Sequence, residues 1–119
     1  MNRFRKAFAV ALRGASLAWR EEPNLRLEAL IAVLVLILAT WLRAAFAPLL
    51  LVMGLVLVAE VFNSAIERMV DLSSPEPHEL AGNAKDLAAA AVLLASLTAV
   101  AVGAVVLGPP LLAKLGLGS

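Results

Sequence analysis

Apolar residues dominate four segments of this chain, and the spacing of polar residues sets the first segment apart from the other three. In residues 2–21, apolar side chains recur on one helical face and basic side chains lie opposite, seven residues apart. The apolar face includes Phe4, Phe8 and Trp19. This pattern predicts a basic amphipathic helix on an anionic membrane surface. A signal peptide is the alternative, and Arg13 disfavours it because it interrupts the apolar stretch.

The other three segments are apolar runs long enough to cross a bilayer, for which a helix needs roughly 20 residues. They are predicted at about 24–43, 48–71 and 85–108. Residues 72–84 are rich in Ser, Pro and Gly and are predicted to form a polar loop. The sequence therefore predicts an all-α membrane protein with a surface helix and three transmembrane helices, in a single domain covering residues 1–119.

Composition adds limits to this picture. A chain of 119 residues, of which 62% are hydrophobic, cannot bury all its apolar surface in one core. The surplus must face lipid or other copies of the chain, so we expect an oligomer. Cysteine is absent, which excludes disulfides and cysteine-based metal sites. The net charge of +1 does not indicate a nucleic-acid-binding protein.

Basic residues are concentrated on one side of the predicted spans. Most precede the first span or flank the polar loop, whereas Arg43 and Lys114 fall on the other side. Because Lys and Arg favour the cytoplasmic side, we expect a cytoplasmic N-terminus and polar loop and an external C-terminus. We expect the location to be a bacterial inner membrane.

The second span carries polar residues in its last turns. At 100° per residue they fall within roughly a 100° arc of one face, and they are Glu60, Asn63, Ser64, Glu67 and Asp71. An intramembrane carboxylate costs roughly 2.5 kcal/mol or more. A seam of hydrogen bonds between helices is one interpretation, and it suits Asn63 and Ser64. A proton-transfer or metal site is the other, with Glu60 as general base and Glu67 as a Mg²⁺ ligand.

Polar residues elsewhere extend the second interpretation. An acidic cluster, Glu21, Glu22 and Glu28, lies where the surface helix meets the first span, and it forms either a solvated turn or, opposite Glu67, part of a metal site. Lys85 opens the third span as a solvated flank or as a phosphate anchor. Carboxylates for Mg²⁺, a lysine for phosphate and a buried base indicate phosphoryl transfer to a membrane-embedded alcohol. The sequence has no P-loop and no glycine-rich kinase pattern.

A long and specific motif is found in "EVFNSAIERMVDLSSPEPHELAGNAKDLAAAAVL" (60–93). It resembles the signature of the small prokaryotic diacylglycerol kinases and their undecaprenol kinase relatives. The resemblance extends upstream through a W-x-x-E-x-x-x-R-x-E pattern at Trp19, Glu22, Arg26 and Glu28. It implies a homotrimer with a surface helix and three membrane helices per chain. It also implies transfer of the γ-phosphate of MgATP to a lipid hydroxyl, in sites formed between protomers.

The resemblance also implies residue roles. It makes Glu60 the catalytic base and makes Glu22 and Glu67 the Mg²⁺ ligands. Nucleotide contacts are implied for a larger set, comprising Arg3, Val10, Glu22, Glu67, Glu76, Pro77, His78, Lys85 and Asp86. Lipid contacts are implied for Arg3, Arg26, Glu28, Glu60 and Ala89. Supporting polar roles are implied for Asn63 and Asp71.

Some positions depart from the best-studied branch of this family. Val10 and Pro77 replace aromatic residues near the nucleotide, and Ala89 stands where a small hydroxyl residue occurs. These departures weaken particular adenine and lipid contacts but leave the metal and base roles intact.

Two lipid substrates fit the motifs. Glu28 and "HEL" (78–80) resemble the diacylglycerol branch, so we expect phosphorylation of diacylglycerol to phosphatidic acid. "E-x-N-x-R" at Glu22, Asn24 and Arg26 resembles the undecaprenol branch, which is the alternative substrate assignment. A small proton-coupled oligomeric transporter or scaffold is the non-enzyme alternative, but it would not need carboxylates on two segments and a cytoplasmic lysine.

Overall fold

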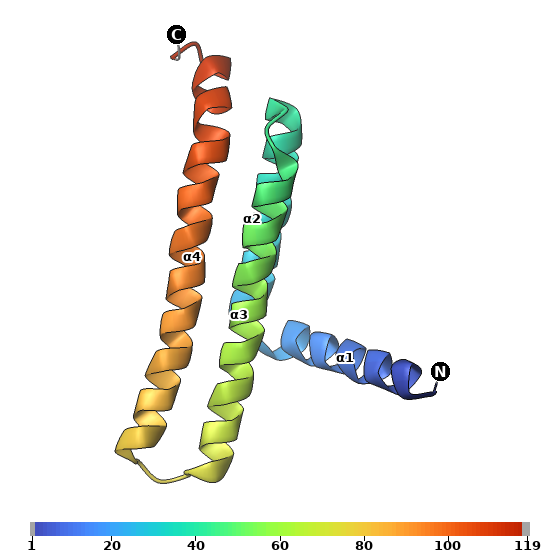
Figure 1. Cartoon of the computed structure of the whole chain (residues 1–119), viewed down its shortest axis with the longest axis vertical. Helices are drawn as coiled ribbons and strands as arrows, with labels where there is room; N and C mark the ends of the chain where they lie inside the picture. Colours follow the sequence, from blue (N-terminus) through green and yellow to red (C-terminus); the bar gives the residue numbers. More distant parts are fainter. Residues whose placement is uncertain (1, 118–119) are drawn as a thin grey trace.

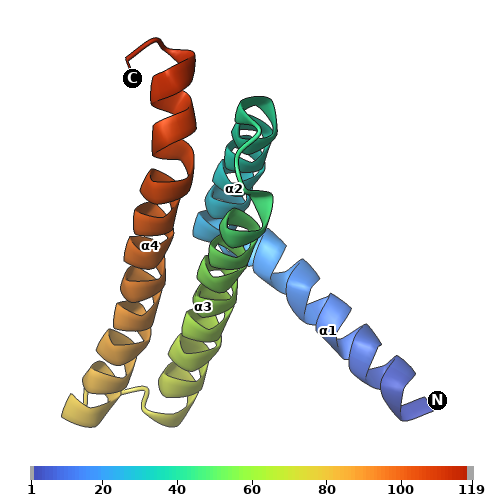
Figure 2. The same ribbon diagram turned by 45° about the horizontal axis from the view of Figure 1, so that its top comes forward.

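The computed structural model describes residues 2–117, which form four helices joined by short connections (Figure 1). The helices are α1 (Asn2–Glu21), α2 (Pro23–Leu42), α3 (Phe46–Ser73) and α4 (Glu79–Lys114). Helices α2, α3 and α4 run alongside one another, and α1 projects away from them (Figures 1 and 2). The prediction of an all-helical chain is confirmed.

Three of the helices, α2, α3 and α4, are long and apolar enough to cross a membrane, as predicted. At 1.5 Å per residue, the 20 residues of α2 extend roughly 30 Å, the thickness of a bilayer's hydrocarbon core. The exposed surface of α4 is largely apolar, and its buried residues are Ala88 and Ala95. This apolar surface is suited to contact with lipid or with other copies of the chain.

A tight turn makes α2 and α3 antiparallel. Arg43 follows the last residue of α2 in a left-handed conformation, with φ of 55°. Its backbone N–H bonds to the carbonyl oxygen of Thr40 at 3.2 Å. Pro48 lies in the first turn of α3, where backbone N–H groups have no partner within the helix. The proline therefore starts the helix without removing a hydrogen bond.

The core lies where α3 packs between α2 and α4, and its contacts with α4 are the more extensive. One face of α3 is buried along most of the helix, at residues that recur every three or four positions: Leu49, Val52, Val56, Glu60 and Ser64. The partner helices present small residues to the core, among them Ala32 and Ala39 of α2 and Ala88 and Ala95 of α4. Small side chains allow close approach of helix backbones.

The connection between α3 and α4 is shorter than predicted. Since α4 begins at Glu79, the prediction of a loop over 72–84 is wrong, and the linker is confined to 74–78. The reason is the helix cap that His78 provides, because its Nδ1 accepts a hydrogen bond from the backbone N–H of Leu80 at 3.1 Å.

The other end of α4 also differs from the prediction, which ended this span at residue 108. The helix continues through Pro109 and Pro110 to Lys114. Each proline removes one backbone N–H donor, and such losses are tolerated in membrane helices. The Nζ of Lys114 lies 4.9 Å from the centroid of the Trp41 ring, so a cation–π contact joins the end of α4 to the end of α2.

Candidate active site

Polar side chains occupy the buried face of α3 in the half of the helix that ends at Ser73. Glu60 and Ser64 are only 6% and 8% exposed. Glu67 and Asp71 follow along the helix and are exposed. The polar residues of α3 therefore run from a buried carboxyl group to accessible ones.

Glu28 of α2 faces Glu60 of α3. Their carboxyl groups lie within hydrogen-bonding reach of each other. The Oε2 atom of Glu28 is buried and has no hydrogen-bond partner among residues 2–117. A buried polar atom without a partner is costly and is rare in folded proteins. This oxygen is therefore a candidate ligand-binding atom.

Asn63 lies between Glu60 and Glu67 on the polar face of α3 and contacts Glu67. Its side-chain Nδ2 donates a hydrogen bond to Oε1 of Glu67 at 3.3 Å, one helical turn further on. Its Oδ1 is buried and is unpaired within the described part of the chain. Asn63 thus restrains the Glu67 carboxylate and leaves an acceptor available.

Glu22 lies at a sharp elbow between α1 and α2. It adopts an extended conformation, with φ of −112° and ψ of 94°, and Pro23 begins the next helix. Its backbone N–H still bonds to the carbonyl oxygen of Ala18 at 2.9 Å. The Glu22 side chain is near enough to Glu60 to influence it electrostatically. A single residue thus ends one helix, caps the next and brings a carboxylate toward α3.

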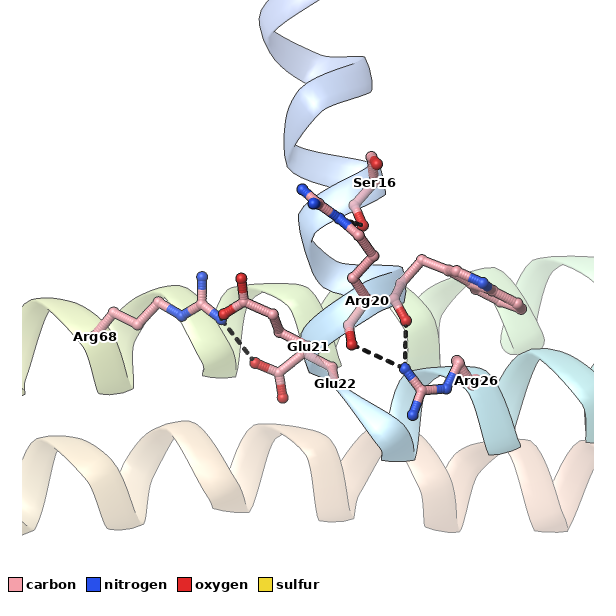
Figure 3. Close-up of polar contacts among 7 residues, drawn as sticks. Ser16, Arg20, Glu21, Glu22, Arg26 and Arg68 are labelled. Carbon is pink, nitrogen blue, oxygen red and sulfur yellow. Dashed lines mark hydrogen bonds and ion pairs between the residues drawn. The ribbon is translucent and has the colours of Figure 1, made fainter.

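Arg68 of α3 contacts two carboxylates at this elbow (Figure 3). Its Nη2 lies 3.1 Å from Oε1 of Glu21 and 3.3 Å from Oε1 of Glu22. In the sequence, Arg68 is one of the basic residues that flank the polar loop, and that pattern does not predict its contact with the elbow. Four-residue spacing from Glu60 through Ser64 to Arg68 is the signal that was present, since it places Arg68 near the same face.

Arg26 holds the elbow from the other side. Its Nη1 donates to the backbone carbonyl oxygens of Trp19 at 2.6 Å and Arg20 at 3.1 Å (Figure 3). Carbonyl groups in the last turn of a helix lack partners within the helix, so Arg26 satisfies two at the end of α1. The lipid contact implied for Arg26 by resemblance stays a prediction, and its contacts in this chain are with α1.

A second polar contact joins α3 to α4 near the linker. The Nζ of Lys85 lies 2.5 Å from Oδ1 of Asp71, and both side chains are accessible to solvent. Asp86 is exposed beside it. Glu76 and Pro77 are exposed in the linker, where the carbonyl oxygen of Glu76 accepts a hydrogen bond from the preceding Ser74 hydroxyl.

The remaining site residues lie on other surfaces. Arg3 and Val10 are exposed on α1, the helix that projects from the other three (Figure 1). Ala89 is exposed on α4. Within one chain, the structure brings one group of predicted site residues together and separately pairs Asp71 with Lys85; the group comprises Glu22, Glu28, Glu60, Asn63 and Glu67.

The carboxylates are suited to a metal ion that also binds a ligand. No group of three or more His, Cys, Asp or Glu side chains within residues 2–117 is arranged to hold a metal by itself. Glu22 and Glu67 are both near enough to Glu60 to act on it electrostatically. In phosphate-transfer sites Mg²⁺ takes one or two carboxylates and completes its shell with phosphate oxygens and water. The oxygen donors of Glu22 and Glu67 fit that kind of site.

An apolar cleft of about 360 Å³ begins at Glu28 and lies between α2, α3 and α4. Apart from Glu28 and Ser96 its walls are apolar, and they include Ile31, Val56, Val100 and Leu107. The partly unpaired Glu28 carboxyl group therefore stands at a polar end of a cleft that is otherwise suited to a hydrocarbon chain.

The helices and the carboxylate cluster define a helical membrane protein with a site suited to phosphoryl transfer. Residues 9–107 match the family model for prokaryotic diacylglycerol kinase. The chain therefore belongs to the prokaryotic diacylglycerol kinase family, and it is a kinase.

Curated relatives agree with this family. A diacylglycerol kinase of Escherichia coli strain K12 is 40% identical over 102 residues, covering 83% of this chain and 84% of that protein. A diacylglycerol kinase of Synechocystis is 43% identical over 110 residues, covering 89% of this chain and 63% of that protein. An undecaprenol kinase of Bacillus subtilis is 34% identical over 114 residues, covering 93% of each chain. These relatives contradict the non-enzyme alternative.

Proposed function

We propose that this protein transfers the γ-phosphate of MgATP to the hydroxyl group of diacylglycerol and so produces phosphatidic acid for phospholipid metabolism. The observation that carries the proposal is the buried Glu60, which faces Glu28 at the end of an apolar cleft and is flanked by Glu22 and Glu67. A lipid hydroxyl and a metal-bound phosphate need these two environments side by side. Family membership supports the same reaction class.

Glu60 is the general base of the proposed reaction. The lipid chains enter the apolar cleft and the hydroxyl group meets the carboxylates at its end. Glu60 accepts the hydroxyl proton as the oxygen attacks the γ-phosphorus, and the bond from that phosphorus to the bridging oxygen of ADP breaks. Glu28 binds the polar part of the lipid through its unpaired Oε2. Mg²⁺ bound by Glu22 and Glu67 would neutralise charge on the ATP phosphates.

The nucleotide is proposed to bind on the side of Lys85 and the linker. Lys85 is the proposed phosphate anchor, and its contact with Asp71 positions it between α3 and α4. Asp86 and the linker residues Glu76, Pro77 and His78 are proposed to contact the nucleotide, as are Arg3 and Val10. Because Arg3 and Val10 lie on α1, which projects from the other helices, we propose that they contact the nucleotide in a site formed between copies.

We propose a homotrimer in the bacterial inner membrane, with α1 lying on the cytoplasmic surface. In one chain Glu67 and much of the apolar surface of α4 are exposed, and neighbouring copies would cover them. The distribution of basic residues supports the orientation. Of the ten Lys and Arg residues, Arg43 and Lys114 lie at the end opposite the carboxylates, and the other eight lie toward the carboxylate end, as expected for the cytoplasmic side. The active site and N-terminus would then be cytoplasmic and the C-terminus external.

Undecaprenol is the second candidate substrate. Relatives named for both lipids exist, and the diacylglycerol kinases among them are 37–43% identical against 34% for the undecaprenol kinase. Glu28 also favours diacylglycerol, whereas the Glu22, Asn24 and Arg26 pattern favours undecaprenol. We assign diacylglycerol as the principal substrate and undecaprenol as the alternative.

The test is a direct competition between the two lipids. Purified protein in detergent micelles receives radiolabelled ATP with Mg²⁺ and equal mole fractions of diacylglycerol and undecaprenol, and the phosphorylated lipids are separated. We expect phosphatidic acid as the main product. Undecaprenyl phosphate as the main product would exchange the two assignments, and the absence of any labelled lipid would overturn the proposal.

A further inference from the structure

Arg68 joins α3 to the elbow between α1 and α2, at a place where α1 is otherwise lightly packed. Ala18 is the one buried residue of α1 within the described range Asn2–Glu21. A small gap of about 200 Å³ separates α1 from α3 beside it, with Gly14, Leu17 and Ala65 among its lining residues. The ion pairs of Arg68 with Glu21 and Glu22 are therefore important contacts between α3 and the end of α1.

The contact leaves half of the Glu22 carboxylate available. Arg68 takes Oε1 of Glu22 at 3.3 Å, while the side chain also lies within electrostatic range of Glu60. The Glu22 side chain is 24% exposed, less than the 52% of its neighbour Glu21. A carboxylate bound at one oxygen by a guanidinium presents the other oxygen in a restricted direction.

Charge gives Arg68 a second effect on the same group. Glu22 lies beside Glu21 in the chain and near Glu60 in space, so like charges act on it from two sides. The positive charge of Arg68 offsets this repulsion. Without it, the Glu22 side chain would turn toward solvent, since rotation away from Glu60 separates the negative charges.

We propose that Arg68 is a positioning residue that orients Glu22 for the Mg²⁺ of MgATP, an inference that rests on the proposed function. Arg68 holds Oε1 of Glu22 from the neighbouring helix and leaves Oε2 for the metal. Its second bond, to the half-exposed Glu21, is not required for this role. Residues of this kind act through the metal ligand and do not touch the reacting atoms.

The expected effect is a change in metal affinity. Residues that hydrogen-bond to metal-coordinating side chains typically contribute about 10–100-fold to metal affinity or activity. Because Arg68 and Glu21 are about half exposed, water weakens the contact, and we expect about a three- to tenfold effect. Lipid affinity should change little, since Arg68 does not line the apolar cleft.

The experiment compares Arg68→Gln with the unmodified full-length protein in lipid nanodiscs. One readout is the Mg²⁺ concentration that gives half-maximal kinase rate. The other is Mn²⁺ binding in the presence of a non-hydrolysable ATP analogue, measured by electron paramagnetic resonance without turnover. Both half-saturating concentrations should rise about three- to tenfold, and the KM for lipid should stay within about twofold.

Three variants make the comparison specific. Arg68→Lys keeps the charge but not the fork of donors, so it should restore part of the metal affinity. Arg20→Gln removes a positive charge from the same end of α1 without touching Glu22, and it should leave metal affinity unchanged. Glu21→Gln retains the contact between Arg68 and Glu22 and should shift metal affinity less than about twofold.

The outcomes separate this inference from the proposed function. If the unmodified protein shows neither lipid phosphorylation nor metal–nucleotide binding, the proposed function fails. If the unmodified protein is active and Arg68→Gln binds Mn²⁺ normally, Arg68 has no positioning role. Equal shifts in Arg68→Gln and Glu21→Gln would also overturn the inference, because the elbow rather than Glu22 would then be what Arg68 supports. Should Arg68→Gln fail to assemble, a normal metal affinity in Arg68→Lys would overturn it.

Discussion

The two halves of α3 use the same buried face for different purposes. From Phe46 to Ala59 the buried positions are Leu49, Val52 and Val56, which pack against the neighbouring helices. Beyond Ala59 the same face continues with Glu60 and Ser64. The backbone does not change at the boundary, since α3 is one uninterrupted helix of 28 residues.

This difference shows how a membrane helix can provide both a core and a reactive site. A carboxyl group at a core position is held by the same packing that holds a leucine, so it has little freedom to move. Its burial has an energetic cost that the apolar half does not have. Changes in the apolar half should therefore affect stability, and changes in the polar half should affect catalysis.

Replacing the buried carboxyl group should give the largest effect. We expect Glu60→Gln to assemble normally and to lose about 10²–10⁴-fold in kinase rate, because an amide of the same shape cannot accept the hydroxyl proton. The rate is measured with saturating lipid and MgATP, and assembly by size-exclusion chromatography with light scattering. Glu79→Gln is the control, an exposed glutamate in the first turn of α4. Near-normal turnover in Glu60→Gln would remove this residue from the role of base.

Truncation of a side chain in the apolar half of α3 should lower stability and leave the kinase rate nearly unchanged. Leu49 is fully buried, so Leu49→Ala should lower the free energy of unfolding by about 2–5 kcal/mol through the cavity it leaves. The rate of the folded fraction should stay within about threefold. Reversible unfolding in mixed detergent micelles measures the first quantity, and a kinase assay on the same samples measures the second. A stable but inactive variant would contradict the division between the two halves.

The metal ligands should give a smaller effect on rate but a larger one on Mg²⁺ dependence. Glu22→Gln and Glu67→Gln should each raise the Mg²⁺ concentration for half-maximal rate by about tenfold, as loss of one of few protein ligands predicts. The double variant should lose less than the sum of the two free-energy changes, since both disrupt one site. Full additivity would indicate separate sites.

The smallest effect is expected at the far end of the molecule. Lys114→Gln removes the cation–π contact with Trp41, which is worth about 0.5–1 kcal/mol at exposed positions. We expect a loss of stability of that size and an unchanged kinase rate. A loss of rate without a loss of stability would show that this end of α4 communicates with the carboxylates.

The local pattern of α3 predicted its polar face, because helical geometry alone determines which residues share a side. The residues of other helices that contact this face could not be predicted in the same way. That Glu28 faces Glu60 depends on how α2 packs against α3, and the bonds of Arg68 depend on the angle of the elbow at Glu22. No single segment contains this information.

The errors at the ends of α4 have a different origin. Ser, Pro and Gly around residues 72–84 indicated a loop, but the cap formed by His78 starts the helix within that stretch. The span was also predicted to end near residue 108, yet the helix continues through Pro109 and Pro110 to Lys114. Turn residues predict a break only where the neighbouring backbone groups have no other way to be satisfied.

The short linker at 74–78 bears on the order in which the helices are made and inserted. Since α3 and α4 are joined so closely, they must enter the bilayer as adjacent antiparallel helices of one chain. The helix that partners Glu60 is α2, which is synthesised before α3. Insertion in chain order would place α2, which carries Glu28, in the membrane before the buried Glu60, whereas Asp71, near the end of α3, would enter before its partner Lys85. With this order of helices, the buried Glu60 would always enter the membrane after the helix that carries its partner.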